Sequence, residues 1–117
     1  MKVIIAGGRD FTDIAKLFDV CDYMLQNQKP IEVVSGCAEG ADKLGERYAR
    51  DSGLVLTKFP ADWDTHGKSA GYRRNIQMAE YADALIAFWD GKSKGTEHMI
   101  DLARKHGLQV KVVNYKL

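Results

Sequence analysis

Glycine and charged residues recur together in four short segments of the sequence. These segments are residues 7–10 (GGRD), 35–42 (SGCAEGAD), 70–75 (AGYRRN) and 91–96 (GKSKGT). Glycine allows a ligand to approach the main chain closely, and a helix that begins after such a turn offers unpaired N–H groups and a partial positive charge. The four segments together predict a rim that binds phosphate.

Side chains in and near this rim define a set of candidate ligand-binding residues. Arginine suits bidentate contact with phosphate, threonine can cap its helix and also donate to phosphate, and a tryptophan face can stack on a nucleobase. Turn glycines and surface lysines also have plain structural interpretations, as turn formers and solvated charges. For Asp42, bonds to backbone N–H groups in a first helical turn are expected before any catalytic role. The candidates are Gly7, Gly8, Arg9, Asp10, Ser35, Gly36, Gly40, Asp42, Trp63, Lys68, Arg74, Asn75, Gly91, Gly95 and Thr96.

Hydrophobic patterning predicts the elements that position these residues. Apolar runs indicate strands over residues 3–6, 31–35, 54–57, 83–89 and 110–113, and 3.6-residue periodicity indicates helices over about 12–28, 40–51, 70–82 and 96–105. This alternation predicts an α/β fold, a Rossmann-like three-layer sandwich whose five-stranded, mainly parallel sheet carries helices on both faces. Such sheets bind ligands outside the carboxyl ends of their strands. We expect a single domain over residues 1–117.

Two local expectations concern the approach to the site. Residues 61–68 show no clear period and are expected to form a loop rich in functional side-chain types. In the helix that follows, the apolar residues expected to face the sheet are Tyr72, Ile76, Ala79 and Ala82. This arrangement would turn Arg74 away from the sheet.

Composition excludes several classes of function. The 117 residues are 45% hydrophobic and 28% charged, and their net charge of +1 creates no field that would steer the chain to DNA or to an anionic membrane. Cys21 and Cys37 fit no metal template, and neither the Walker motif nor the G-x-G-x-x-G fingerprint occurs, so we expect no metal site and no cofactor. Because no apolar run reaches signal-peptide or membrane-spanning length, we expect a cytoplasmic location and no membrane partner.

Three parts of the sequence resemble motifs of known families. Residues 33–42 (VVSGCAEGAD) resemble the S-G-x-A-x-G-x-D element of the DNA-processing DprA/Smf proteins. Arg74-Asn75, ahead of the apolar residues 82–86, resembles the R-N element of the same proteins. Residues 91–97 (GKSKGTE) resemble a relaxed P-G-G-x-G-T-x-x-E signature of the lonely guy (LOG) phosphoribohydrolases. These families make up the SLOG superfamily of Rossmann-like domains.

Further residues narrow the resemblance within that superfamily. With residues 7–11 (GGRDF), Trp63 and Gly67-Lys68 added, the chain is most similar to the small YspA-like (cpYpsA-related) branch, and the resemblance extends from Val3 to about Val113. It implies that a nucleotide or nucleotide-derived small molecule binds across the strand ends, with the protein acting as a sensor or sequestering module.

The resemblance leaves two other functions open, and with them the question whether the protein is an enzyme. A LOG-like hydrolase would cleave the N-glycosidic bond of a nucleotide, but the position three after Thr96 is Met99 where the LOG signature has glutamate. A substitute carboxylate is then required, and Glu39 is the first choice, acting together with Arg74. A DprA-like protein would bind single-stranded DNA, which the net charge of +1 disfavours. Because related folds often pair through helices, a homodimer is also an open alternative.

Overall fold

The five predicted apolar runs form one parallel sheet in the computed structural model, which describes residues 1–116. The strands lie side by side in the order β3-β2-β1-β4-β5, and every neighbouring pair is parallel. β1 lies at the centre of the sheet because its apolar run has no polar face to expose, and Val3, Ile4 and Ile5 are fully buried. The strand bounds are Lys2–Gly7 (β1), Glu32–Ser35 (β2), Val55–Lys58 (β3), Ala84–Trp89 (β4) and Gln109–Asn114 (β5).

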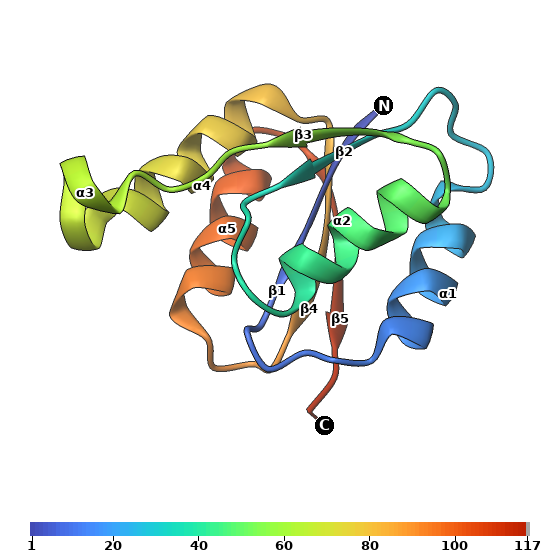
Figure 1. The fold of residues 1–117 in the computed structure, drawn as a ribbon, viewed down its shortest axis with the longest axis horizontal. Coiled ribbons are helices and arrows are strands. Elements are labelled where there is room, and N and C mark those ends of the chain that lie inside the picture. The colour runs from blue at the N-terminus through green and yellow to red at the C-terminus, as the bar shows by residue number, and fades with distance from the viewer. Residues whose placement is uncertain (117) are drawn as a thin grey trace.

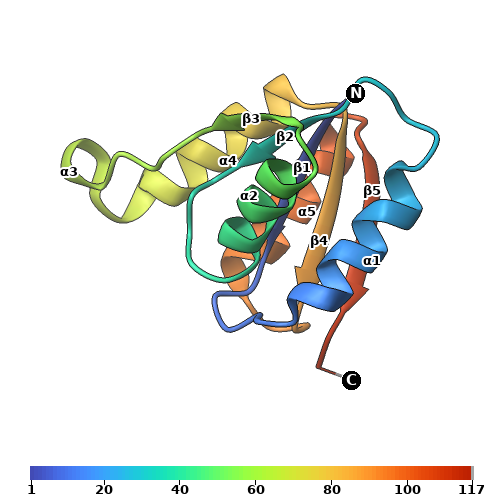
Figure 2. The ribbon, with the colours of Figure 1, turned by 45° about the vertical axis from the view of Figure 1, so that its right-hand side comes forward.

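Helices cover both faces of this sheet and complete a three-layer α/β sandwich (Figures 1 and 2). On one face, Val3 and Ile5 pack with α1 and α2; on the other, Ile4 and Ala6 pack with α4 and α5. The alternation of side chains along a strand assigns successive residues of β1 to opposite cores. The helix bounds are Ile14–Leu25 (α1), Ala41–Asp51 (α2), Trp63–His66 (α3), Ala70–Tyr81 (α4) and Lys94–Lys105 (α5). The predicted fold class is therefore confirmed.

Residues 61–68, expected to be a loop, instead contain two short helices. Asp62 caps α3 by accepting a bond of 3.1 Å from the N–H of Thr65, and the 3-10 helix η1 follows over Gly67–Ser69. Segments of three or four residues are too short to produce a visible hydrophobic period, so the sequence pattern missed both. The two helices have no buried residue, and α3 projects from the body of the molecule next to the start of α4 (Figure 1).

The sheet-facing side of α4 also differs from the prediction. Asn75, Met78 and Ala79 are buried, whereas Tyr72 and Ile76 are 46% and 40% exposed. The ring of Tyr72 packs edge-on against His98 of α5, with 4.5 Å between ring centroids. The prediction is confirmed for Ala79 and wrong for Tyr72 and Ile76. It assigned the bulkiest apolar residues to the sheet, whereas the first turns of α4 contact α5 and the η1 segment.

The start of α5 corrects a further expectation. The helix begins at Lys94, two residues earlier than predicted, and its N-cap residue is Ser93. Thr96 therefore lies buried in the first turn and does not cap the helix. At the other end, Gly107 adopts a positive φ of 75° directly after the C-cap, a position where glycine commonly ends a helix.

Candidate functional site

A pocket of about 240 Å³ opens at the carboxyl end of β1, on the side of the sheet covered by α4 and α5. The strand order reverses here, because the chain runs from β1 outward to β2 and β3 and later returns to β4 on the other side of β1. Open α/β sheets bind ligands at this topological switch point. The lining residues are Ala6, Gly7, Arg9, Ala38, Asp42, Trp63, Lys68, Gly71, Tyr72, Arg74, Asn75, Met78, Ser93, Gly95, Thr96 and Met99.

The pocket brings together only part of the predicted site. The candidates that line it are Gly7, Arg9, Asp42, Trp63, Lys68, Arg74, Asn75, Gly95 and Thr96. Those outside its lining are Gly8, Asp10, Ser35, Gly36, Gly40 and Gly91, together with the candidate catalytic residue Glu39, which is exposed.

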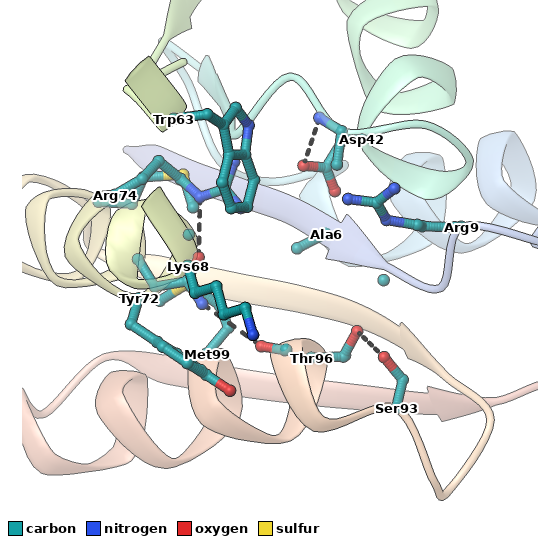
Figure 3. Close-up of a pocket in the computed structure, with 16 residues that line it drawn as sticks. Ala6, Arg9, Asp42, Trp63, Lys68, Tyr72, Arg74, Ser93, Thr96 and Met99 are labelled. Carbon is teal, nitrogen blue, oxygen red and sulfur yellow. Dashed lines mark hydrogen bonds between the residues drawn. The ribbon is translucent and has the colours of Figure 1, made fainter. Parts of the chain in front are cut away.

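The first two glycine segments contact each other. Gly40, the N-cap of α2, has a φ of +79°, and a Cβ there would overlap the carbonyl of Gly8 and lie 2.6 Å from the oxygen of Arg9. The N–H of Ala41 donates to the carbonyl of Gly8 over 3.2 Å. The N-terminus of α2 thus binds the turn after β1, and this contact holds the backbone that carries Arg9 into the pocket (Figure 3).

Two other candidates make contacts within the protein. The hydroxyl of Ser35 donates to Glu46 Oε2 over 2.7 Å and accepts a 3.1 Å bond from the N–H of Cys37. Asp10 turns away from the pocket, accepting a 2.6 Å bond from Tyr115 and lying 3.0 Å from the Lys116 ammonium group. These bonds shape the turns around the pocket.

Asp42 and Arg74 are brought together inside the pocket by the absence of a side chain at Gly36. A Cβ on Gly36 would lie 2.7 Å from Arg74 Nη1 and 2.9 Å from Asp42 Oδ2. Arg74 donates to the carbonyl of Gly36 and, through Nε, to Asn75 Oδ1 over 3.0 Å. Arg74 is therefore half-buried and faces the β2–α2 turn, with its head group fixed by two bonds.

Burial controls the charge of the Asp42 carboxyl group. Asp42 is 5% exposed, and burial raises its pKa to about 6. The 3.2 Å bond that Oδ2 accepts from the N–H of Ala38 and the charge of Arg74 oppose this rise in pKa. Burial also lowers the pKa of Arg74, and the charge of Asp42 counteracts that effect.

The N-terminus of α5 forms the opposite wall of the pocket. Ser93 makes no side-chain capping bond, its hydroxyl lies 3.4 Å from that of Thr96, and Gly95 and Thr96 belong to the first turn. First-turn N–H groups have no partner within their own helix, so they are available to an anion. Asn75 fastens α4 to this turn, because its Nδ2 donates to the carbonyl of Gly95 over 3.3 Å and lies 3.1 Å from His98 Nδ1. Burial lowers the pKa of His98, which favours its neutral form at this contact.

Two aromatic rings stand at the mouth of the pocket. Trp63 is 52% exposed, and its ring lies 3.4 Å from the place that a Cβ on Gly71 would occupy. Tyr72 lies below Trp63 in Figure 3, and Lys68 of η1 extends between the two rings toward Thr96. Such rings can hold the flat face of a ligand by stacking.

Several lining residues were not among the predicted site residues. Tyr72 was assigned to the core, although its position beside Arg73 and Arg74 was a signal for the site. Ser93 belongs to the fourth glycine segment and could have been included with Thr96. Met99 is 1% exposed and forms an apolar wall where the LOG signature has glutamate. Asp42 is consequently the one carboxyl group among the residues that line the pocket.

The described residues form neither a metal-binding cluster nor a membrane-spanning helix. No group of three or more His, Cys, Asp or Glu side chains within residues 1–116 is arranged to hold a metal ion. In the same part of the chain, every helix is too short or too polar to span a bilayer.

Comparison with known proteins gives three similarities. The family model described as "YspA, cpYpsA-related SLOG family" matches residues 1–66. The "Gene 61 protein" of Mycobacterium phage D29 is 38% identical over 116 residues, which cover 93% of this chain and 93% of that protein. An X-ray structure of the protein TM1055 aligns with a TM-score of 0.67 at 21% identity, covering 93% of this chain and 71% of that one, and it supports the fold.

Proposed function

Because the chain belongs to the YspA, cpYpsA-related SLOG family, we propose that its pocket binds a nucleotide or nucleotide-derived small molecule. The observation that carries this proposal is the convergence of the α5 N-terminus with the cationic side chains of Arg9, Lys68 and Arg74 in one pocket. The phosphate of the ligand lies at the first turn of α5, and its base lies against Trp63 and Tyr72. The protein would act as a sensor or a sequestering module.

The charges of the pocket favour an anionic ligand. Three cationic side chains and one carboxyl group line it, while the whole chain has a net charge of only +1. The guanidinium of Arg74 is held at Gly36 and Asn75, so little side-chain freedom is lost when it contacts phosphate. The pocket lining therefore carries an excess of positive charge, whereas basic and acidic side chains nearly balance over the whole chain.

The size and aromatic mouth of the pocket favour a ligand with one base. A volume of about 240 Å³ is below the range of roughly 300–1,000 Å³ typical of drug-sized ligand pockets. The exposed rings of Trp63 and Tyr72 leave room for a base at the opening. Polynucleotide binding normally needs an extended basic groove, which a net charge of +1 does not favour.

Calorimetric titration tests the proposed function. Nucleoside mono- and diphosphates, ADP-ribose and cyclic nucleotides are titrated into the folded protein, and at least one is expected to bind. Arg74→Ala should weaken that binding by about 10- to 100-fold, as expected when a hydrogen bond to a charged group is lost. Arg73→Ala is the matched control, because Arg73 is exposed, lies outside the pocket lining and, within residues 1–116, bonds only Ser69 Oγ, over 3.1 Å.

A second variant separates binding from folding. Thr96→Val preserves side-chain shape and leaves the bonds of Asp42 and Arg74 unchanged, yet it removes the hydroxyl from the α5 turn and should weaken binding too. Circular dichroism verifies that each variant is folded. Folded wild-type protein that binds none of these ligands would show that the proposal is wrong.

One observation favours hydrolysis of an N-glycosidic bond as a second function. Asp42 presents a buried carboxyl group whose raised pKa of about 6 suits general base catalysis near neutral pH. Glu39, the sequence-based choice for this role, is exposed and outside the pocket lining. Release of free base from a bound nucleotide, followed by chromatography and abolished in Asp42→Asn, would establish this activity; intact nucleotide after prolonged incubation would exclude it.

A further inference from the structure

A carboxyl group in a pocket for phosphate requires an explanation. Asp42 projects between Arg9 and Arg74 (Figure 3), and it lines the same pocket as the first turn of α5. An ionised carboxylate repels phosphate oxygens, and both groups are hydrogen-bond acceptors, so they cannot bond each other. Asp42 therefore does not contact the phosphate; it faces another part of the ligand.

The carboxylate retains acceptor capacity toward the pocket. Its Oδ2 accepts one bond from the N–H of Ala38 over 3.2 Å. A carboxylate can accept about four hydrogen bonds through its two oxygens. A ligand group that pairs with Asp42 must therefore be a hydrogen-bond donor. An uncharged donor is favoured, because a cationic group would compete with Arg74 for the carboxylate.

The order of residues along the pocket indicates which ligand group this is. The ring of Trp63 lies beside Gly71, close to the position of the Arg74 guanidinium, and Arg74 lies beside Asp42 at Gly36. Asp42 thus lies deeper than the aromatic mouth and across the pocket from the α5 turn (Figure 3). In a nucleotide whose base is at the mouth and whose phosphate is at α5, the sugar hydroxyls occupy the middle.

We propose that Asp42 accepts hydrogen bonds from the vicinal hydroxyls of the ligand's sugar and makes the site selective for ribonucleotides over deoxyribonucleotides. This inference rests on the proposed function. Asp42 also has a structural role, because it accepts the bond that shapes the turn at Ala38. A purely structural role would change stability or overall affinity and would leave the sugar preference unchanged.

The test compares sugar preference in matched variants. The four ribonucleoside 5′-monophosphates and their 2′-deoxy counterparts are titrated into wild type, Asp42→Ala, Asp42→Asn and Glu39→Gln. Wild type should bind the ribose form about tenfold or more tightly, as expected when a hydrogen bond to a charged group is lost. Asp42→Ala should reduce this ratio to near one, and Asp42→Asn should lower it. Glu39→Gln, which changes an exposed carboxyl group outside the pocket lining, should retain the wild-type ratio.

The ratio of affinities is the decisive quantity, because removing the negative charge of Asp42 should itself tighten binding of every anion. Equal binding of ribose and deoxyribose forms by wild type would overturn the inference, as would a preference that survives in Asp42→Ala. Absence of binding by all eight monophosphates would overturn it as well. The proposed function itself fails only if diphosphates, ADP-ribose and cyclic nucleotides also do not bind.

Discussion

The pH dependence of stability should identify Asp42 as a buried acid. Burial raises its pKa from 3.8 to about 6, against the opposing effects of the Ala38 N–H and Arg74. The folded protein therefore holds the Asp42 proton more tightly than the unfolded chain does. The stabilisation that results is fully present below the unfolded pKa of 3.8 and is lost as the pH rises through the folded pKa of about 6.

The size of the effect follows from the two pKa values. A difference of about 2 pKa units corresponds to roughly 3 kcal/mol between the limits of low and high pH, at about 1.4 kcal/mol per unit. Part of this change lies below pH 4, because the unfolded carboxyl group titrates there. Between pH 4 and pH 8, the free energy of unfolding of wild type should fall by about 2 kcal/mol relative to Asp42→Asn, whose side chain does not titrate.

Urea denaturation at pH 4, 5, 6, 7 and 8 measures this difference. Unfolding is followed by circular dichroism, and the free energy of the Asn variant is subtracted from that of wild type at each pH. Asp64→Asn, which changes an exposed carboxyl group in α3, corrects for the loss of one acidic residue from the chain. A difference that is flat with pH would refute the claim that burial dominates at Asp42. A difference that grows with pH would show that Arg74 and the Ala38 N–H outweigh burial.

Two further substitutions test the turns around the pocket. Tyr115→Phe removes the 2.6 Å bond to Asp10 and loosens the turn that carries Arg9, so ligand affinity measured by calorimetry should fall severalfold while the urea midpoint changes little; unchanged affinity would refute this positioning role. Ser35→Ala removes the 2.7 Å bond to Glu46, whose side chain is 3% exposed, and should lower the free energy of unfolding in urea by about 1–3 kcal/mol. Unaltered stability would show that Glu46 needs only its ion pairs with Lys43, Arg50 and Lys58, whose nitrogens lie 3.8–3.9 Å from Oε1.

The sequence predicts the fold well because its strongest signals are local. The short apolar run of residues 3–6, which ends in two glycines, is typical of a strand buried on both faces. The period of Leu17, Cys21 and Leu25 fits one face of a helix. These signals do not depend on what packs beside them. At α4 the local signal was insufficient, because contacts with α5 decide which residues are buried. Tyr72 packs against His98 at the surface, and Asn75 is buried, where it donates to the carbonyl of Gly95.

The site was predicted by residue type and only partly by position. Arg74 and Asn75 of α4 meet Thr96 of α5 because these two helices converge at the end of β1, and the order of motifs along the chain indicates this convergence. The sequence does not reveal that Ser35 donates a hydrogen bond to Glu46 or that Asp10 accepts one from Tyr115, since each bond joins residues that are not neighbours in the chain. Tertiary contacts decide which polar residues of a turn remain available to a ligand.

The glycine segments show most clearly which turns are filled by the protein's own contacts and which remain open to a ligand. A side chain at Gly7 would overlap the carbonyl of Phe88, and one at Gly40 would overlap that of Gly8, so the space beside these glycines is filled by the protein itself. At Gly95, apart from its chain neighbours and its own helix backbone, no atom of the described residues lies within 4 Å of the position that a Cβ would occupy. The adjacent N–H groups belong to the start of α5. The glycines of residues 7–10 and 35–42 therefore form the turns themselves. Residues 91–96, by contrast, offer open space beside the backbone N–H groups at the start of α5. Binding of a phosphate should for this reason depend mainly on the N-terminus of α5.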